Sequence, residues 1–228
     1  MAGRAHLKQK FRPQLLMTLI PASAILMAAI IASFVLKIGF SAFTRDTAAI
    51  AGIHPLAGFL SNMGILLWGA SFFISLFTAI TLRNFLTKGR FVFLISSALL
   101  SGYLMFDDFF MFHEFLAPKY LGLNDNLVLF ILVLAAALYL YLQRRMILKT
   151  DFWMLVLALT LLAFSVFVDV SYLRITDGQF GQLEYIFEEG PKWLGIACWC
   201  SYHVQTAYRF IKERLGLGKS DIETNPSE

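Results

Sequence analysis

Four ionisable side chains interrupt the apolar stretch from Leu104 to Glu114, which reads LMFDDFFMFHE. Two adjacent aspartates, a histidine and a glutamate supply carboxylate oxygens and imidazole nitrogens within eight residues. Carboxylates with imidazoles suit Zn²⁺, Mn²⁺ or Fe²⁺, whereas carboxylates alone suit Ca²⁺ or Mg²⁺. A bound divalent ion lowers the pKa of water toward about 7 for hydrolysis, and a spare carboxylate can act as general base. The stretch therefore predicts metal-assisted or acid–base chemistry.

Further ionisable groups recur in other apolar segments. Asp169 lies in SVFVDVSYL, His54 lies in GIHPLAGF, and YIFEEGPKWLGI carries Glu188, Glu189 and Lys192. Counting along each helix at about 1.5 Å per residue places all of these groups at a similar depth, near one edge of a bilayer. A charge at the bilayer centre costs about 2.5 to 3.5 kcal/mol on insertion scales, and less near the interface. Their recurrence at one depth on four segments predicts a shared site.

We assign these groups two kinds of role. The predicted metal ligands are Asp107, His113, Glu114, Asp169 and Glu188. The predicted catalytic groups are Asp108, Glu189 and Lys192. Zinc, manganese, iron, calcium and magnesium all fit such a donor set, and the chain has neither HExxH nor the paired Glu-x-x-His of di-iron bundles. Ser61 lacks the G-x-S-x-G or Ser-x-x-Lys context of a nucleophile.

Helical spacing predicts how the first stretch divides between faces. At about 100° per residue, Asp107 and Glu114 share a face and Asp108 lies about 100° round from Asp107. His113 points about 120° to the other side. We therefore expect Asp107 and Glu114 to face a bundle interior together, with or without Asp108, and His113 to join them only if the helix ends or unwinds near Phe112.

Composition shows which elements must position these groups. The 228 residues are 58% hydrophobic and only 15% charged, with 23 phenylalanines, so one soluble core cannot bury the apolar surface. A helix needs about 20 apolar residues to span the hydrocarbon. The fold class is an all-α polytopic membrane protein, a six-transmembrane-helix bundle. Its expected spans are residues 14–37, 57–81, 91–112, 127–143, 152–173 and 191–211.

The basic residues predict the orientation. Residues 14–211 form the expected transmembrane domain, between a basic tail at 1–13 and a polar tail at 212–228. Fourteen of the 19 lysines and arginines fall in the two tails and in the loops that share their side. By the positive-inside rule, both termini are cytoplasmic, in a cell inner membrane. Because the basic residues are sorted by loop, we expect the lipid bilayer as partner and no nucleic acid; oligomeric state is left open.

Two local features refine this organisation. The first segment is too long for a secretory h-region, which indicates an uncleaved signal-anchor helix. In the sixth, Gly190-Pro191 predicts a helix start or a sharp kink. Lys192, Trp199 and His203, with Gly195, share one helical stripe that runs inward from there.

Three functions fit these groups. The leading hypothesis is a metal-dependent membrane hydrolase or other enzyme acting on a lipid or lipid-linked substrate. The second is a cation- or proton-coupled transporter or channel subunit, because the acids outnumber Lys192 and Arg174 and must be protonated, hydrated or bound to a cation. The third is a non-catalytic assembly or interaction protein, in which the acids only form a structural ion-pair network.

Three sequence stretches carry a resemblance. DDFFMFHE and FEEGPKWLGIACWCSYH, with FLSNMGILLWGASFFISLF before them, resemble a recurrent type of six-helix bacterial inner-membrane protein that has no established activity. In kind, a membrane-embedded Asp/His/Glu site is also similar to the seven-helix alkaline ceramidase group of zinc amide hydrolases. The chain lacks that group's paired late-helix histidines and has one helix fewer. The first resemblance implies a fold and no mechanism.

Overall fold

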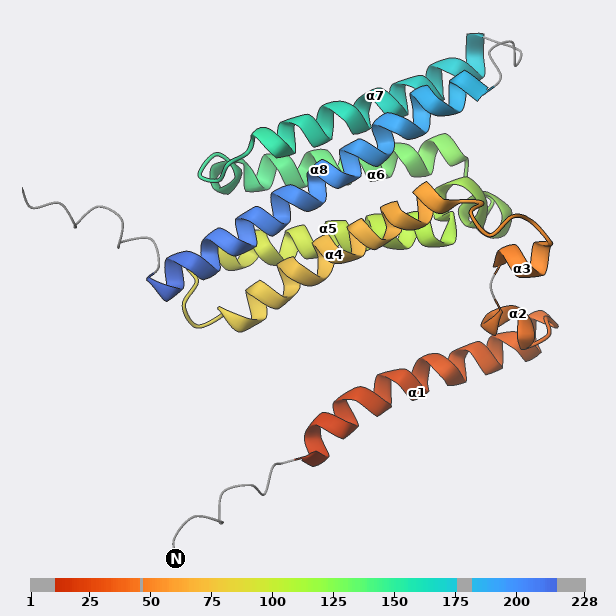
Figure 1. The fold of residues 1–228 in the computed structure, drawn as a ribbon, viewed down its shortest axis with the longest axis horizontal. Coiled ribbons are helices and arrows are strands. Elements are labelled where there is room, and N and C mark those ends of the chain that lie inside the picture. Colours follow the sequence, from red (N-terminus) through yellow and green to blue (C-terminus); the bar gives the residue numbers. More distant parts are fainter. Residues whose placement is uncertain (1–10, 46, 176–181, 217–228) are drawn as a thin grey trace, which may run out of the picture. The chain divides into compact units, whose positions relative to one another are not determined.

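A computed structural model describes residues 11–45, 47–175 and 182–216, and within these ranges every regular element is a helix (Figure 1). The chain forms two compact units, Met1–Ala57 and Gly58–Glu228. The first contains α1 (Phe11–Leu36) and the short helices α2 (Ser41–Thr44) and α3 (Thr47–Ala51). The part of α1 from Leu19 to Leu36 is strongly apolar and buries none of its residues in the protein, as expected of a helix solvated by lipid.

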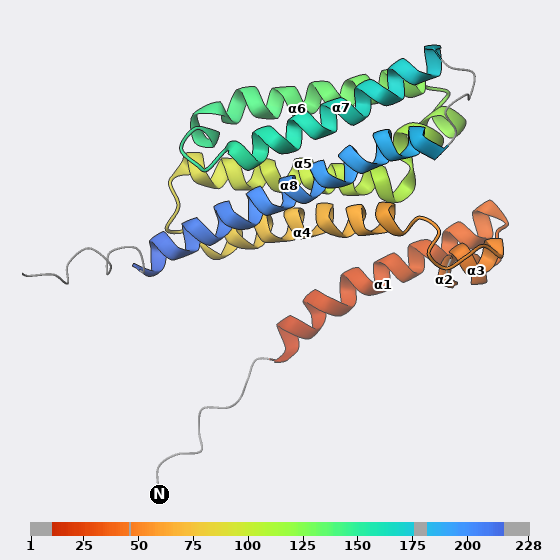
Figure 2. The same cartoon turned by 45° about the horizontal axis from the view of Figure 1, so that its top comes forward.

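The second unit is a bundle of long helices. Its elements are α4 (Phe59–Thr81), α5 (Lys88–Phe110), the π-helix η1 (Phe112–Leu121), α6 (Asp125–Ile147), α7 (Trp153–Ile175) and α8 (Gln182–Leu215). The long α8 packs against α7 and α4, and α4 also packs against α5 (Figures 1 and 2). Helix α6 packs mainly against α5 and η1, and its Tyr139 ring also meets that of Trp199 on α8. The centre of the unit is therefore formed where α4, α5 and α8 meet.

Each of the six predicted apolar segments coincides with one long helix. Among the described residues, α1, α4, α5 and α6 are long and apolar enough to cross a membrane, so the chain has the helices of a membrane protein. In α7 the apolar part is the shorter Trp153–Asp169, and α8 carries EEGPK within its length. The six-span count and the orientation remain predictions, and residues 1–10 and 217–228 of the two tails lie outside the described ranges.

Of the two possibilities predicted at Gly190-Pro191, a helix start is wrong, and a sharp kink stays a prediction. Helix α8 begins at Gln182 and continues through Pro191 to Leu215. Proline removes one backbone donor, but helices of membrane bundles tolerate this where neighbouring groups or local adjustment satisfy the freed carbonyl. The predicted inward stripe on α8 is confirmed, since Gly195, Trp199 and His203 are all buried.

A polar core runs between α4, α5, α6 and α8. It consists of buried hydroxyl, indole and imidazole side chains: Ser71, Ser75, Ser97, Ser101, Tyr139, Trp199 and His203. Trp199 Nε1 donates to Ser101 Oγ at 3.0 Å, and the hydroxyls of Ser97 and Tyr139 lie 2.8 Å apart. The Trp68 and Trp199 rings meet edge to face with centroids 5.6 Å apart. Polar groups facing one another across helices are the usual means of joining helices in lipid.

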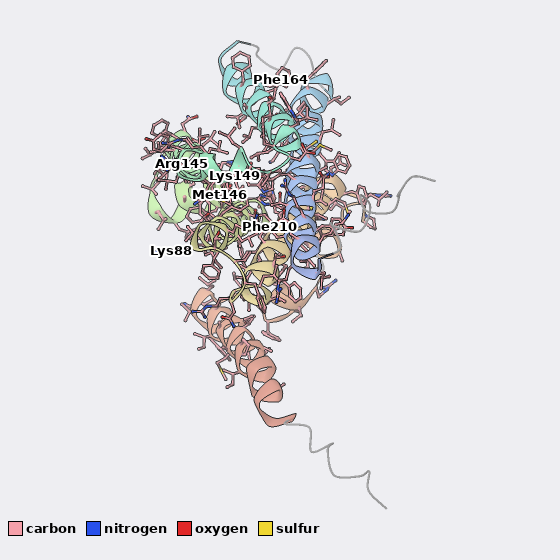
Figure 3. The ribbon with its side chains drawn as sticks, turned by 90° about the vertical axis from the view of Figure 1, so that its left-hand side faces the viewer. Lys88, Arg145, Met146, Lys149, Phe164 and Phe210 are labelled. Atoms are coloured by element: carbon pink, nitrogen blue, oxygen red, sulfur yellow. The ribbon has the colours of Figure 1, made fainter. Side chains whose placement is uncertain are left out.

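Basic side chains gather at one end of the second unit. Lys88, Arg145 and Lys149 lie at the end where α5 begins and α6 finishes (Figure 3). Glu213 accepts hydrogen bonds there from Arg90 at 2.8 Å and Arg209 at 3.0 Å. Burial opposes ionisation of Glu213, but these hydrogen bonds outweigh it and lower its pKa. One carboxylate thus ties the start of α5 to the end of α8.

Helix packing gives a first prediction, at Gly195. A Cβ there would lie 2.8 Å from Leu162 Cγ and 3.1 Å from the carbonyl oxygen of Ala158, both on α7. Gly195→Ala should therefore force α7 and α8 apart and lower the free energy of unfolding by about 1 to 3 kcal/mol. Thermal unfolding in one detergent measures this.

The matched control is Gly190→Ala, on the same helix, where nothing lies within 4 Å of the new Cβ. Its melting temperature should equal or slightly exceed that of the wild type, because alanine lowers the entropy of the unfolded chain. Equal melting temperatures for the two variants would contradict the observed packing of α7 on α8.

Candidate functional site

The candidate site lies where helix α5 ends and the π-helix η1 begins. Helix α5 ends at Phe110, and Met111 adopts the left-handed conformation, with φ 48° and ψ 49°. Such a conformation is uncommon for a residue other than glycine. The Met111 N–H bonds to the backbone oxygen of Asp107, and η1 begins at the next residue. The chain direction therefore changes between Asp108 and His113.

Asp107 stabilises this break through its side chain. The residue is only 2% exposed. Its Oδ1 accepts a hydrogen bond from the backbone N–H of His113 at 3.2 Å, and its Oδ2 lies 2.5 Å from His113 Nδ1. These two bonds fix the orientation of the imidazole and leave Nε2 pointing away from Asp107. The prediction that His113 reaches this side if the helix ends near Phe112 is confirmed.

Glu114 lies on the other side of the histidine. Its side chain is 57% exposed, and its Oε1 lies 3.5 Å from His113 Nε2. The predicted pairing of Asp107 and Glu114 on one interior face is wrong, because the left-handed Met111 ends the regular helix on which that angle was counted. His113 instead stands between a buried carboxylate and an exposed one.

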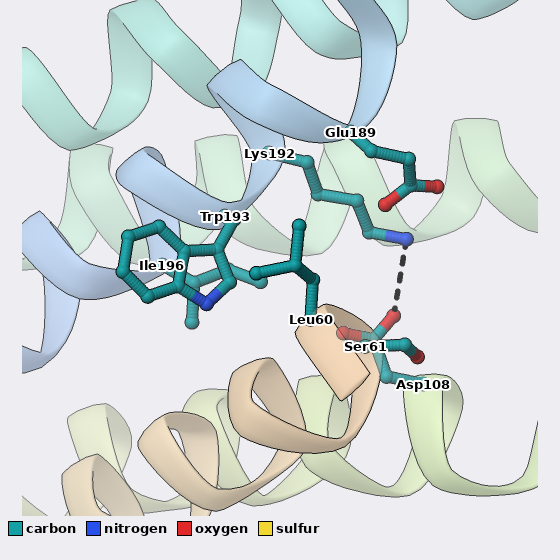
Figure 4. A pocket seen from close by; sticks show the side chains of 7 residues that line it. All are labelled: Leu60, Ser61, Asp108, Glu189, Lys192, Trp193 and Ile196. Atoms are coloured by element: carbon teal, nitrogen blue, oxygen red, sulfur yellow. Dashed lines mark ion pairs between the residues drawn. The ribbon is translucent and has the colours of Figure 1, made fainter. Parts of the chain in front are cut away.

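Asp108 connects three helices. Its Oδ2 accepts a hydrogen bond from Trp68 Nε1 of α4 at 2.9 Å, and its Oδ1 lies 3.7 Å from Lys192 Nζ of α8 (Figure 4). Trp68 is a functional neighbour that the sequence analysis missed. The signal was available, since Gly64, Trp68, Ser71 and Ser75 follow the alternating four- and three-residue spacing of a helix interface.

A small pocket opens beside Asp108 and Lys192. It encloses about 240 Å³, part of it open to solvent. Its walls are Leu60, Ser61, Asp108, Glu189, Lys192, Trp193 and Ile196 (Figure 4). Charged groups thus line one side and apolar groups the other. Ser61 takes part in the lining, although its sequence context predicted no role.

Lys192 interacts electrostatically both with the surrounding carboxylates and with His113. The carboxylates of Glu189, Glu114 and Glu188 act electrostatically on its ammonium group, as Asp108 does. The same ammonium group acts on His113. The structure therefore brings together seven of the eight predicted residues around Lys192 and His113. We call the set Asp107, Asp108, His113, Glu114, Glu189 and Lys192 the acid–histidine site.

Asp169 is the predicted residue that the structure leaves apart. It is half-buried on α7 and makes no ion pair or side-chain hydrogen bond within the described part of the chain. Within that same part, no three His, Cys, Asp or Glu side chains gather closely enough to hold a metal ion. Metal binding therefore stays a prediction, and the side chain of Arg174, predicted to neutralise acids, lies outside the described residues.

The titration of His113 gives a second prediction. The hydrogen bond to Asp107 raises the pKa of His113 above its ordinary value of about 6.5, with Asp107 and Glu114 adding to the effect while burial and Lys192 oppose it. A raised pKa in the folded state stabilises the fold fully below about pH 6.5, and this stability is lost as the pH rises through the raised value. The melting temperature should fall across that window.

His113→Gln removes the titrating group, so its melting temperature should change less with pH over the same range. His54→Gln is the control: this histidine belongs to the first unit, where its Nδ1 accepts a hydrogen bond from the N–H of Leu56 at 3.2 Å. It should keep the wild-type profile. A His113→Gln profile parallel to that of the wild type would show that the Asp107–His113 pair is not formed.

Comparison with known proteins shows the family. Residues 19–206 match the family described as domain of unknown function DUF8692, and the chain belongs to it. The match includes five of the long helices from α4 to α8 in whole or in large part, together with the acid–histidine site. No curated protein and no solved structure matches the chain.

Proposed function

We propose that this member of the DUF8692 family is a membrane hydrolase that uses His113 as a proton-transfer group on a lipid or lipid-linked substrate. The observation that carries the proposal is the Asp107–His113 pair, in which a buried carboxylate holds Nδ1 and leaves Nε2 toward the exposed Glu114. This arrangement selects the tautomer and orientation of a catalytic histidine. The pair forms at the break between α5 and η1.

The chemistry assigned to His113 is proton transfer at Nε2. As a water oxygen attacks the carbonyl carbon of an ester or amide, Nε2 accepts the proton that the water loses. It then gives this proton to the leaving oxygen or nitrogen as the bond to carbon breaks. Asp107 acts as a positioning residue, because it stabilises the imidazolium that forms between the two steps.

Lys192 is assigned to the negative charge that develops on the attacked group. A positioned ammonium group stabilises such charge in a site from which water is partly excluded. Asp108 holds Lys192 in place at 3.7 Å and is itself fixed by Trp68. Glu189 lines the same pocket. In this role Asp108 and Glu189 hold the ammonium group of Lys192 in position.

The substrate class follows from the two kinds of pocket wall. Leu60, Trp193 and Ile196 offer an apolar surface beside the charged groups, which suits a molecule with a polar head and an apolar tail. The pocket is small and partly open to solvent, so it suits one end of a lipid rather than a whole soluble ligand.

Metal assistance remains part of the proposal. Histidines that bind metals usually donate their other ring N–H to a carboxylate, as His113 does to Asp107. In this metal-dependent form of the proposal, His113 Nε2 and Glu114 would be two ligands of a divalent ion that supplies a more acidic water, and Nε2 would bind the ion instead of transferring the proton. Compared with the sequence prediction, Asp107 changes from ligand to orienting partner.

Hydrolysis by purified protein tests the proposal. The full chain would be placed in vesicles of phosphatidylethanolamine and phosphatidylglycerol, and fatty acid and headgroup release would be followed by mass spectrometry. His113→Gln should lower turnover about 100-fold or more. The activity should also fall as the pH drops through the raised pKa of His113, because the protonated ring cannot accept a proton.

Two controls make the outcome specific. Asp125→Asn removes an exposed carboxylate at the start of α6 and should leave turnover unchanged. A chelator should stop the reaction if a divalent ion takes part, and should have no effect if His113 acts alone. Equal product release by wild type and His113→Gln across a broad set of lipids and lipid-linked substrates would overturn the proposal.

Proton-coupled transport is the second candidate, and the polar core is the observation that favours it. Polar side chains continue from Asp108 and Trp68 to Trp199 and Ser101, well inside the bundle. A pH-sensitive dye trapped in the same vesicles would report proton flux. Flux that is lost in Asp108→Asn, without lipid hydrolysis by the wild type, would favour transport over the enzyme.

A further inference from the structure

A second polar feature lies deep in the bundle, away from the acid–histidine site. His203 on α8 is 1% exposed and Ser75 on α4 is 0% exposed. Within the described residues, neither His203 Nε2 nor Ser75 Oγ has a hydrogen-bond partner. Buried polar atoms are almost always paired with protein or with ordered water, so two orphan atoms on contacting helices call for a shared partner.

The register of α4 on α8 brings these two atoms to neighbouring levels. A Cβ on Gly64 would lie 3.1 Å from Ile196, and further along both helices Trp68 meets Trp199. The two helices therefore run in the same direction. Ser75 lies seven residues after Trp68, and His203 lies four residues after Trp199. The two levels therefore differ by three residues, or about 4.5 Å along the helix axis at about 1.5 Å per residue. Two hydrogen bonds through one water span about 5.5 Å.

The neighbouring polar groups already have partners. Ser71 Oγ donates to the Leu67 carbonyl at 2.8 Å, and Ser101 Oγ accepts from Trp199. Ser97 Oγ bonds to the Phe93 carbonyl and to the Tyr139 hydroxyl. Hydrocarbon around the bundle offers no hydrogen bonds at all. A small polar molecule inside the bundle is therefore the partner that suits both atoms.

We propose that the bundle binds an internal water molecule between α4 and α8, hydrogen-bonded to His203 Nε2 and Ser75 Oγ. With the imidazole proton on Nδ1, the water donates to Nε2 and accepts the hydroxyl proton of Ser75. Buried water in proteins needs two to four polar partners, and His203 Nε2 and Ser75 Oγ supply two of them. The site is independent of the proposed hydrolysis.

The position of this water gives it a structural consequence. The His203 ring lies 5.1 Å from that of Trp199 and 5.0 Å from that of Tyr202, measured between centroids. Trp199 donates a hydrogen bond to Ser101, and the Tyr202 hydroxyl lies 2.9 Å from Thr150 Oγ1. A water at His203 therefore lies near two hydrogen-bonded pairs, of which one joins α8 to α5 and the other joins α8 to the connection between α6 and α7.

Solid-state NMR of the full chain in lipid vesicles tests the site. Histidine labelled with ¹⁵N gives ring signals, and the His203 signals are identified by their loss in His203→Phe. Polarisation that starts on water protons should reach His203 Nε2, and the Nε2 shift should be that of a hydrogen-bonded acceptor. If no polarisation reaches His203 in the wild type, the proposal is overturned without any variant.

A pair of serine variants identifies the second partner of the water. Ser75→Ala should reduce the polarisation that reaches Nε2 by at least half. Ser71→Ala, on the same helix and equally buried, should leave it unchanged, because that hydroxyl is already bonded to a backbone carbonyl. Unchanged His113 signals in each variant report an intact bundle. Equal transfer in the two serine variants would remove Ser75 from the site.

Discussion

Hydrocarbon cannot donate or accept a hydrogen bond, and the rest of the second unit follows from this constraint. Polar side chains of α4, α5, α6 and α8 must bond to one another, so these helices share a polar core while their apolar faces turn outward. Trp199 donating to Ser101 and Ser97 bonding to Tyr139 are direct results. The long apolar side chains left exposed on α4 to α6, such as Phe73, Leu99 and Phe130, are those that lipid solvates at no cost.

The acid–histidine site shows the same constraint near the end of a helix. Where η1 begins, its first backbone N–H groups have no helical partner, and a side chain can accept a hydrogen bond from one of them. Asp107 accepts the N–H of His113 and orients its ring with the other carboxylate oxygen. The left-handed Met111 costs some conformational energy, and these bonds offset it. The same Asp107 carboxylate therefore bonds the backbone where the new helix begins and orients the His113 ring.

Periodicity and residue type predicted much of this protein. Six apolar segments gave six long helices, and spacing on α8 correctly placed Trp199 and His203 on a buried stripe. Seven of the eight predicted site residues gather around His113 and Lys192. Angles counted on an unbroken helix failed at Glu114, because they assume regular geometry that ends at Met111. Depth alone could not tell which neighbours Asp169 faces, since residues at one level can face different helices, and its role at the site stays a prediction.

The sequence by itself determined that the chain forms long apolar helices and that the carboxylates of the predicted site recur near one end of them. Hydrophobicity and helical period are properties of short stretches, so they can be read without knowing the neighbours. Only the tertiary structure decided that His113 pairs with Asp107, that Asp108 joins Trp68 to Lys192, and that α8 continues through Pro191. These choices depend on the rotation and register of packed helices, because a buried polar group takes whichever partner the neighbouring helix brings within hydrogen-bond distance.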